Sequence, residues 1–176
     1  MYRIAILKKK ATLFSIDLYK SAMTTTLTIN KRASFDYDLI ETFEGGLVLS
    51  GAEVKAVKLG QAQLKGSFIF IRSHEAWLKN AFIASYKPAS SQQVHYDPNR
   101  DRKILLHERE IKRLLGKQTS EGLTIVPLRL YTKQHLVKIE LALARGKRKY
   151  EKREAIKKRE TQQKLREEMK IKRYRS

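Results

Sequence analysis

The chain has 176 residues, no cysteine, and 38 Lys and Arg against 18 Asp and Glu, which gives a net charge of +20. This length fits one domain with tails, and the absence of cysteine excludes disulfides, thiolate-bound metal centres and cysteine nucleophiles. The large positive charge favours nucleic acid as a partner over an anionic membrane, and no uncharged stretch exceeds ten residues, which is too short for a transmembrane helix.

The first segment, residues 1–23, has Lys8-Lys9-Lys10 and Asp17 within its apolar stretches. A secretory signal needs an uninterrupted apolar region after its charges, so this pattern favours a disordered N-terminal extension. Met23 is then a candidate initiator, and we expect residues 1–22 to be dispensable.

The next segment combines strand and helix signals. Phe35–Glu41 alternates imperfectly and predicts a strand that meets a turn or bulge at Gly45-Gly46, with a short apolar strand after it. Ser50 and Glu53 have the spacing of a capping box, so a helix is predicted to begin there and to stop at Gly60.

Residues 67–72 and 75–83 predict a β-hairpin joined at Ser73-His74. Strand alternation places the large aromatic side chains of this hairpin in the core, namely Phe68, Phe70, Trp77 and Phe82. Residues 87–102 lack periodicity and contain two prolines and two adjacent serines, which is typical of a loop.

Apolar residues from Ile104 to Leu115 are spaced as one face of a helix that ends at Gly116. Residues 123–131 and 136–143 predict a second hairpin around Thr132–His135. Proline cannot donate to a ladder, so Pro127 is expected at an edge or a bulge.

The last segment, residues 145–176, contains 15 basic and 5 acidic residues, and it has neither glycine nor proline after Gly146. Three Glu–Lys pairs at i,i+4 spacing contribute only about 0.2–0.5 kcal/mol each. Its apolar residues form no continuous stripe for docking. The segment is therefore predicted to be disordered when free and helical on a polyanion.

Together these patterns give about six strands and two or three helices, with no internal repeat. Short turns and little parallel crossover signal favour a mainly β fold with flanking helices. We predict a small closed antiparallel barrel over residues 24–144, between an N-terminal extension and a basic tail.

No catalytic or metal-binding constellation stands out. The four histidines lack metal-ligand spacing, and neither a Walker loop nor a Gly-x-Gly-x-x-Gly motif is present. We therefore predict no catalytic residues, no metal and no cofactor.

Basic residues form three separate clusters, Lys31-Arg32, Arg100–Lys103 and Arg145–Lys149. Each alone is typical of a solvated surface, but a barrel could bring them together along a phosphate backbone. The candidates for stacking on bases are Tyr37, Tyr86, Tyr96 and Tyr131.

Six segments match a known family in the same order: Asn30–Ala33, Phe43–Leu47, Gly51–Lys55, Arg100–Leu106, Glu121–Thr124 and Gly146–Arg153. From about Asn30 to Met169 the chain resembles small protein B, the SsrA-binding protein family that partners transfer-messenger RNA (tmRNA) in bacterial trans-translation. The resemblance implies an oligonucleotide-binding-like (OB-like) barrel of six antiparallel strands and a non-enzymatic role. It also implies binding to the tRNA-like domain of tmRNA and delivery of that RNA to stalled ribosomes.

The resemblance assigns RNA contacts to Glu44, Leu105 and Lys138, with Leu105 as a core residue the alternative. Lys138 is flanked by apolar strand residues, so it should point outward toward phosphate. The further expected RNA-binding residues are Asn30, Lys31, Arg32, Arg102 and Lys103.

For the tail, the resemblance implies entry into the decoding site and mRNA channel of the ribosome, against ribosomal RNA. The residues concerned are Gly146, Lys147, Arg148, Tyr150, Glu151, Lys152 and Arg153, where Tyr150 and Glu151 stand at positions that are His and Asp in other members. We expect a cytoplasmic bacterial monomer with no membrane contact. The alternatives are a general ribosomal or RNA-chaperone barrel with a basic tail, and a barrel-based nuclease.

Overall fold

The computed structural model describes residues 24–88, 95–148, 150, 151, 153, 154, 161, 167 and 169. The predicted N-terminal extension therefore lies outside the described residues. The elements in chain order are β1 (Thr25–Ile29), α2 (Ala33–Asp36), β2 (Tyr37–Leu47), α3 (Gly51–Lys58), β3 (Ala62–Gln63), β4 (Phe68–Arg72), β5 (Glu75–Lys79), β6 (Phe82–Ile83), β7 (Arg102–Leu105), α4 (Glu108–Glu121), β8 (Thr124–Lys133) and β9 (Leu136–Gly146).

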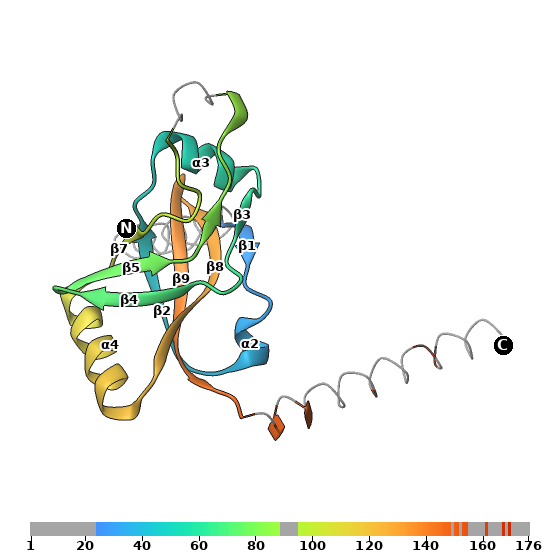
Figure 1. Ribbon diagram of the computed structural model, residues 1–176, viewed down its shortest axis with the longest axis vertical. Helices are drawn as coiled ribbons and strands as arrows, with labels where there is room; N and C mark the ends of the chain where they lie inside the picture. The colour runs from blue at the N-terminus through green and yellow to red at the C-terminus, as the bar shows by residue number, and fades with distance from the viewer. Residues whose placement is uncertain are drawn as a thin grey trace, which may run out of the picture.

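Six of the strands form a closed antiparallel barrel (Figure 1). Their order is β8-β4-β5-β7-β2-β9, and the pairing of β9 with β8 closes the ring. β1 adds to β8 outside the ring, and β3 pairs with β6 in a separate two-stranded ribbon. Closure removes the unpaired edges that an open sheet would expose, and it confirms the predicted fold class.

The core fills the barrel and extends under two helices. Side chains such as Ile69, Leu78 and Leu141 are at most 2% exposed. α3 contributes Val57 and α4 contributes Leu114 to the same cluster, and the two helices lie toward opposite ends of the barrel in Figure 1. Burial of this apolar surface is the main force that holds the barrel together.

A second, smaller cluster attaches α2 to the outside of the barrel. Ala33 of α2 packs with Val126 of β8 and with Ala142 and Ala144 of β9. All four side chains are small or short, so the helix backbone lies close to the strands. This contact positions the Asn30–Arg32 segment that precedes α2.

Local signals in the sequence located the two hairpin turns correctly. Ser73 and His74 connect β4 to β5, and Gln134 and His135 connect β8 to β9, each with positive φ. Two consecutive residues with positive φ are the hallmark of a tight hairpin turn whose twist suits the flanking strands. A bulge lies between Pro127 and the residue two positions later, as the missing N–H of proline predicts.

The predicted capping box is also present. The amide of Glu53 donates to Ser50 Oγ at 3.3 Å, and the amide of Ser50 donates to Glu53 Oε2 at 2.8 Å. Both bonds satisfy N–H groups that the first turn of α3 would otherwise leave unpaired. The helix ends before Gly60, whose φ of 73° lies in the left-handed region.

The prediction that the aromatic residues of the first hairpin are core residues was wrong. Phe68 and Phe82 are 41% and 39% exposed, and Phe70 and Trp77 are only partly buried. The opposite face of β4, which carries Ile69, lines the core instead. Because aromatic and aliphatic residues alternate along β4, both faces are apolar, and the alternation does not show which one points inward.

The hairpin's second strand is also shorter than predicted. β5 stops at Lys79, Asn80 has a φ of 56°, and the chain then forms β6 as a separate strand paired with β3. A residue in the left-handed region breaks the ladder. The break directs Phe82 to a different surface from Trp77.

Two further boundaries differ from prediction. Residues 102–105 form strand β7. The helix begins at Glu108, runs through Gly116 and ends at Glu121, and Gly122 caps it with a φ of 62°. The apolar spacing that suggested one helix from Ile104 therefore combined two elements. His107 with Glu110 caps the true start.

Gly45 and Gly46 do not form a turn, because β2 runs straight through them. A Cβ at Gly45 would lie 2.7 Å from a side-chain carbon of Ile104. The glycine thus permits β7 to approach closely, which is a packing role. The bulge in β2 falls instead between Leu39 and Glu41, and Phe35 belongs to α2.

Candidate nucleic-acid interface

A row of paired residues crosses four strands on the outside of the barrel. Leu105 of β7 pairs with Gly46 of β2, Gly46 pairs with Lys138 of β9, and Lys138 pairs with Tyr131 of β8. Directly paired residues point to the same face of a sheet, and so does Glu44, two residues before Gly46. The register therefore brings Glu44, Leu105 and Lys138 together, as an RNA-contacting surface requires.

Leu105 is not a core residue. Its side chain is 57% exposed, whereas its neighbour Ile104 points inward and is 2% exposed. The exposed leucine lies against Gly46, where its side chain would be 3.5 Å from an added Cβ. The alternative that Leu105 serves only the core is therefore excluded, and its RNA contact stays a prediction.

Glu44 holds the row together electrostatically. Its carboxylate accepts hydrogen bonds from Lys138 Nζ at 2.5 Å, from Lys133 Nζ at 3.2 Å and from the Tyr131 hydroxyl. These bonds, above all those from Lys138 and Tyr131, lower the pKa of Glu44 from 4.5 to about 2. The carboxylate is thus charged at neutral pH and fixes two ammonium groups on the outer face.

Tyr131 belongs to this row but is covered by its neighbours, and its hydroxyl bonds to Glu44. Its side chain is 4% exposed, and burial together with the bond to Glu44 raises the pKa of its hydroxyl. Arg129, which pairs with Glu140, lies over the tyrosine ring at 5.1 Å from its centroid. A buried ring cannot serve as a stacking platform, so Tyr131 positions Glu44 instead.

The sequence pattern did not identify Lys133 or Arg129 as site residues, and it suggested base stacking rather than support of Glu44 for Tyr131. Their signal was present, because Arg129, Tyr131 and Lys133 alternate on one face of the correctly predicted second hairpin. Glu44, the partner of Tyr131 and Lys133, is about 90 residues away in sequence, and only the barrel brings it near.

Arg102 was predicted to contact RNA, and the structure contradicts this. Its guanidinium is fully buried and donates to Glu53 Oε1 at 2.9 Å, to the Ala81 carbonyl at 2.7 Å and to the Pro98 carbonyl at 2.9 Å. Every donor direction thus faces the protein interior. Arg102 ties β7 to α3 and to the loop before it, a structural role.

The neighbours of Arg102 also form ion pairs within the protein. Arg100 pairs with Glu53, and Lys103 pairs with Glu75. The Lys103 side chain is about two-fifths exposed, and its RNA contact stays a prediction. The hydroxyl of Tyr96 donates to the Ile83 carbonyl at 2.9 Å, so this tyrosine also has a structural role.

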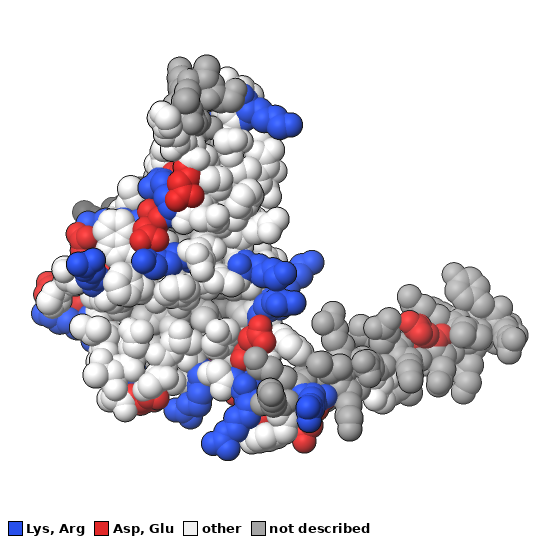
Figure 2. All heavy atoms as spheres, in the orientation of Figure 1, with Lys and Arg blue, Asp and Glu red and all other residues white. Residues whose placement is uncertain are grey.

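Two of the three basic clusters lie side by side next to α2. Asn30 Nδ2 donates to the Pro127 carbonyl at 3.0 Å, which places Lys31 and Arg32 at the exposed start of α2. The Lys147 Nζ donates to the Ser34 carbonyl at 2.8 Å. Figure 2 shows Lys and Arg side chains around α2 and the lower edge of the molecule. The third cluster, which contains Arg102, belongs to the α3 side.

β9 leads directly into the basic tail. It continues to Gly146, two residues beyond the predicted end of the barrel domain, and the Lys147 amide donates to the Asp36 carbonyl at 3.0 Å. The Arg148 amide donates to Glu151 Oε2 at 2.5 Å. Described tail residues with helical backbone are Tyr150, Glu151, Arg153, Glu154, Thr161, Glu167 and Met169. Lys152 lies outside the described residues, and the tail's disorder when free stays a prediction.

The described residues show neither a metal-binding cluster nor a membrane-spanning helix. No group of three or more His, Asp or Glu side chains there is placed to hold a metal ion. Within the same part of the chain, no helix combines the length and apolar character needed to cross a bilayer.

A closed antiparallel barrel with a charged outer row and a basic end defines a small β-barrel protein of the nucleic-acid-binding class. The family model described as SmpB protein matches residues 27–171. This chain belongs to the SmpB family.

Similar proteins agree with this assignment. A protein from Persephonella marina called SsrA-binding protein is 53% identical over 136 residues, which cover 77% of this chain and 88% of that protein. An SsrA-binding protein from a Synechococcus species is 46% identical over 145 residues, covering 82% and 94% of the two chains. A solved structure described as "tmRNA-SmpB: a journey to the center of the bacterial ribosome" is similar with a TM-score of 0.59 and 42% identity, covering 73% of this chain and 93% of that one.

Proposed function

We propose that this protein binds the tRNA-like domain of tmRNA and delivers it to stalled ribosomes for trans-translation, without enzymatic activity, in the bacterial cytoplasm. The observation that carries the proposal is the register that joins Leu105, Gly46 and Lys138 across β7, β2 and β9, with Glu44 beside them. Family membership and the names of the similar proteins support the choice of RNA.

The outer row suits a structured RNA with exposed sugar edges. Lys138 and Lys133 supply cations for phosphate oxygens, and Glu44 supplies a carboxylate that accepts hydrogen bonds from 2′-hydroxyls or base edges. Leu105 offers an apolar surface for a base or ribose. Because Glu44 already orients both ammonium groups, little side-chain ordering remains to be done on binding.

Lys138→Ala tests the row. We expect about tenfold weaker binding of a labelled tRNA-like domain, since a charge-assisted contact contributes about 1.5 kcal/mol. Stability should change by less than about 1 kcal/mol, because the lost pair is exposed. The matched control is Lys112→Ala, which removes an equally charged side chain and its exposed pair with Glu108 on α4. Equal effects of the two variants on RNA binding would exclude the row as the interface.

The tail is proposed to occupy the empty decoding site of the ribosome. Its basic side chains would contact ribosomal RNA on several sides once it is helical. Truncation after Arg148 keeps all of β9 and the Lys147 contacts, so the barrel and its recognition of the tRNA-like domain should persist. Peptide tagging on a message without a stop codon should be lost, and normal tagging by the truncated chain would refute this role.

The identity of the RNA is tested independently by sequencing the RNA that co-purifies with the full chain. We expect one dominant species with a tRNA-like end. A broad ribosomal RNA profile would favour the general ribosomal or RNA-chaperone alternative instead.

A further inference from the structure

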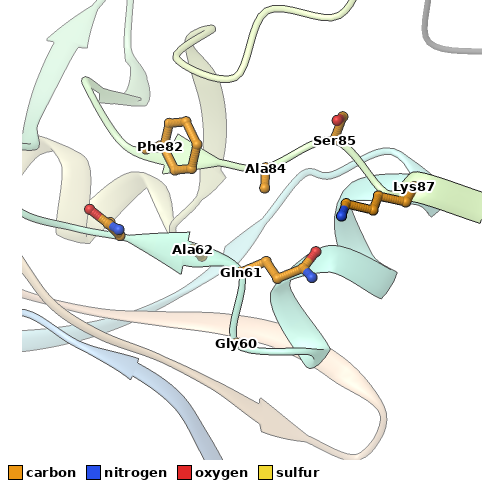
Figure 3. A pocket seen from close by; sticks show the side chains of 8 residues that line it. Gly60, Gln61, Ala62, Phe82, Ala84, Ser85 and Lys87 are labelled. Carbon is orange, nitrogen blue, oxygen red and sulfur yellow. The ribbon is translucent and has the colours of Figure 1, made fainter. Parts of the chain in front are cut away.

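A surface hollow of about 380 Å³ lies where the chain leaves α3 and where β6 ends (Figure 3). Its lining includes Gly60, Gln61, Gln63, Phe82, Ser85 and Lys87. The two walls are held by the β3–β6 pairing and by the Ala84 amide, which donates to the Gln61 carbonyl at 2.9 Å. The hollow therefore has a fixed backbone frame, and its volume lies in the range of small-ligand sites.

Phe82 gives the hollow an aromatic surface. The side chain is 39% exposed, while the next residue, Ile83, is 1% exposed and supplies the packing of β6 into the core. Phe82 is not a member of the core cluster, to which Ile83 belongs. An exposed phenyl ring that borders a hollow offers a face on which a planar base can stack.

Polar side chains at the same hollow are left without a partner in the described part of the chain. Among the described residues, no hydrogen bond or ion pair engages the side chains of Gln61, Gln63 or Lys87. In Figure 3 the side chains of Gln61 and Lys87 extend toward each other from opposite walls. A carboxamide can both donate and accept hydrogen bonds, as the edge of a nucleobase requires.

The charge at this end of the molecule is positive. Lys87 lines the hollow, Lys58 ends α3 just before it, and the ammonium of Lys55 lies 5.4 Å from the centroid of the Tyr86 ring. The lining contains no carboxylate, and Glu53, the acidic residue of α3, is turned inward. An apolar peptide could contact the Phe82 ring but would leave the lysines without a partner. A phosphate ion could pair with the lysines but would leave the ring without a contact.

We infer that this hollow binds one unpaired nucleotide of an RNA strand. The base stacks on Phe82, the amides of Gln61 and Gln63 bond to its edge, and a flanking phosphate lies at Lys87. The hollow is formed by β3, β6 and the segments that follow α3 and β6, rather than by the outer row on β7, β2, β9 and β8. It is thus a second RNA contact that goes beyond the proposed function.

The test titrates fluorescein-labelled octauridylate against the full chain at several salt concentrations. Phe82→Ala should weaken binding at least fivefold, because stacking on one aromatic ring is commonly worth that much, and Phe82→Tyr should restore it. Lys87→Ala should reduce the slope of log K against log salt by about 0.7, the value for one neutralised phosphate. The matched control is Phe68→Ala, a phenylalanine of equal exposure on β4 that should change affinity less than twofold.

A second readout locates the bound RNA. In ¹H–¹⁵N spectra, octauridylate should shift the side-chain amide signals of Gln61 and Gln63. Shifts confined to the tail or to the outer row would overturn the inference, as would equal effects of Phe82→Ala and Phe68→Ala. Displacement of the probe by free UMP at matching nucleotide concentration would show a mononucleotide site and overturn it too. The outcome is separable from the proposed function, which is tested through Lys138 with a different RNA.

Discussion

Replacing Glu53 by glutamine removes the negative charge that holds two arginines and a tyrosine beside α3. The carboxylate accepts hydrogen bonds from Arg100 Nε at 2.9 Å and from Arg102 Nε at 2.9 Å, and its Oε1 lies 3.3 Å from the Tyr96 hydroxyl oxygen. A glutamine keeps one oxygen, so with that oxygen at the Oε1 position its N–H₂ group would face the Ser50 amide and Arg100 Nη2, which now bond to Oε2. The buried Arg102 would then keep its charge without a counter-ion.

The expected loss is about 3–5 kcal/mol of unfolding free energy, the usual result when one partner of a buried ion pair is removed. The pKa of Glu53 supports this magnitude. Burial alone would raise it, yet the bonds from Arg100, the Ser50 amide and Arg102 outweigh burial and lower it from 4.5 to about 2. That difference corresponds to about 3 kcal/mol of stability at neutral pH.

Urea unfolding followed by the fluorescence of Trp77, the single tryptophan of the chain, measures the effect. The control is Asp101→Asn, which breaks the pair with Lys79, where both side chains are more than one-third exposed. This control should lose less than about 1 kcal/mol. A loss of that size in Glu53→Gln as well would refute the view that the buried cluster stabilises the fold.

Three further predictions concern the barrel. Ile69→Ala should lower the free energy of unfolding by about 2–5 kcal/mol, and Phe70→Ala should lower it clearly less, because Phe70 lies on the outer face. A lower urea midpoint for Phe70→Ala than for Ile69→Ala would contradict the assigned faces. Gly45→Ala should destabilise by about 1–3 kcal/mol because its Cβ would overlap β7, whereas Gly46→Ala should have little effect on the thermal midpoint. Because the pKa of Glu53 is lowered in the folded state, its contribution is full above about pH 4.5 and is lost as the pH falls toward 2, so pH-dependent unfolding of Glu53→Gln should lack this component.

Features that depend on neighbouring residues could be predicted from the sequence. The Ser73-His74 turn needs nothing beyond the strands on either side, and the capping box of Ser50 and Glu53 spans one turn of helix. Both appear where the residue pattern placed them. The closed barrel followed from the number of short strands and from the family resemblance together.

Features that depend on distant residues could not be predicted in this way. Arg102 is buried beside its ion-pair partner Glu53, which lies 49 positions earlier in the chain. No local pattern distinguishes Arg102 from Lys103, which is more exposed. Leu105 likewise resembles a core residue in sequence. Its exposure follows from the register of β7 with β2, in which Ile104 takes the inward position.

One strand carries both ends of the proposed RNA-binding apparatus. Lys138 lies near the beginning of β9 and Gly146 at its end, where the tail begins. Eight residues of strand at about 3.3 Å each span about 26 Å, and pairing with β2 and β8 on either side keeps β9 stiff. The pairing on both sides therefore fixes the distance between Lys138 and Gly146, so the start of the tail lies at a constant separation from the outer row.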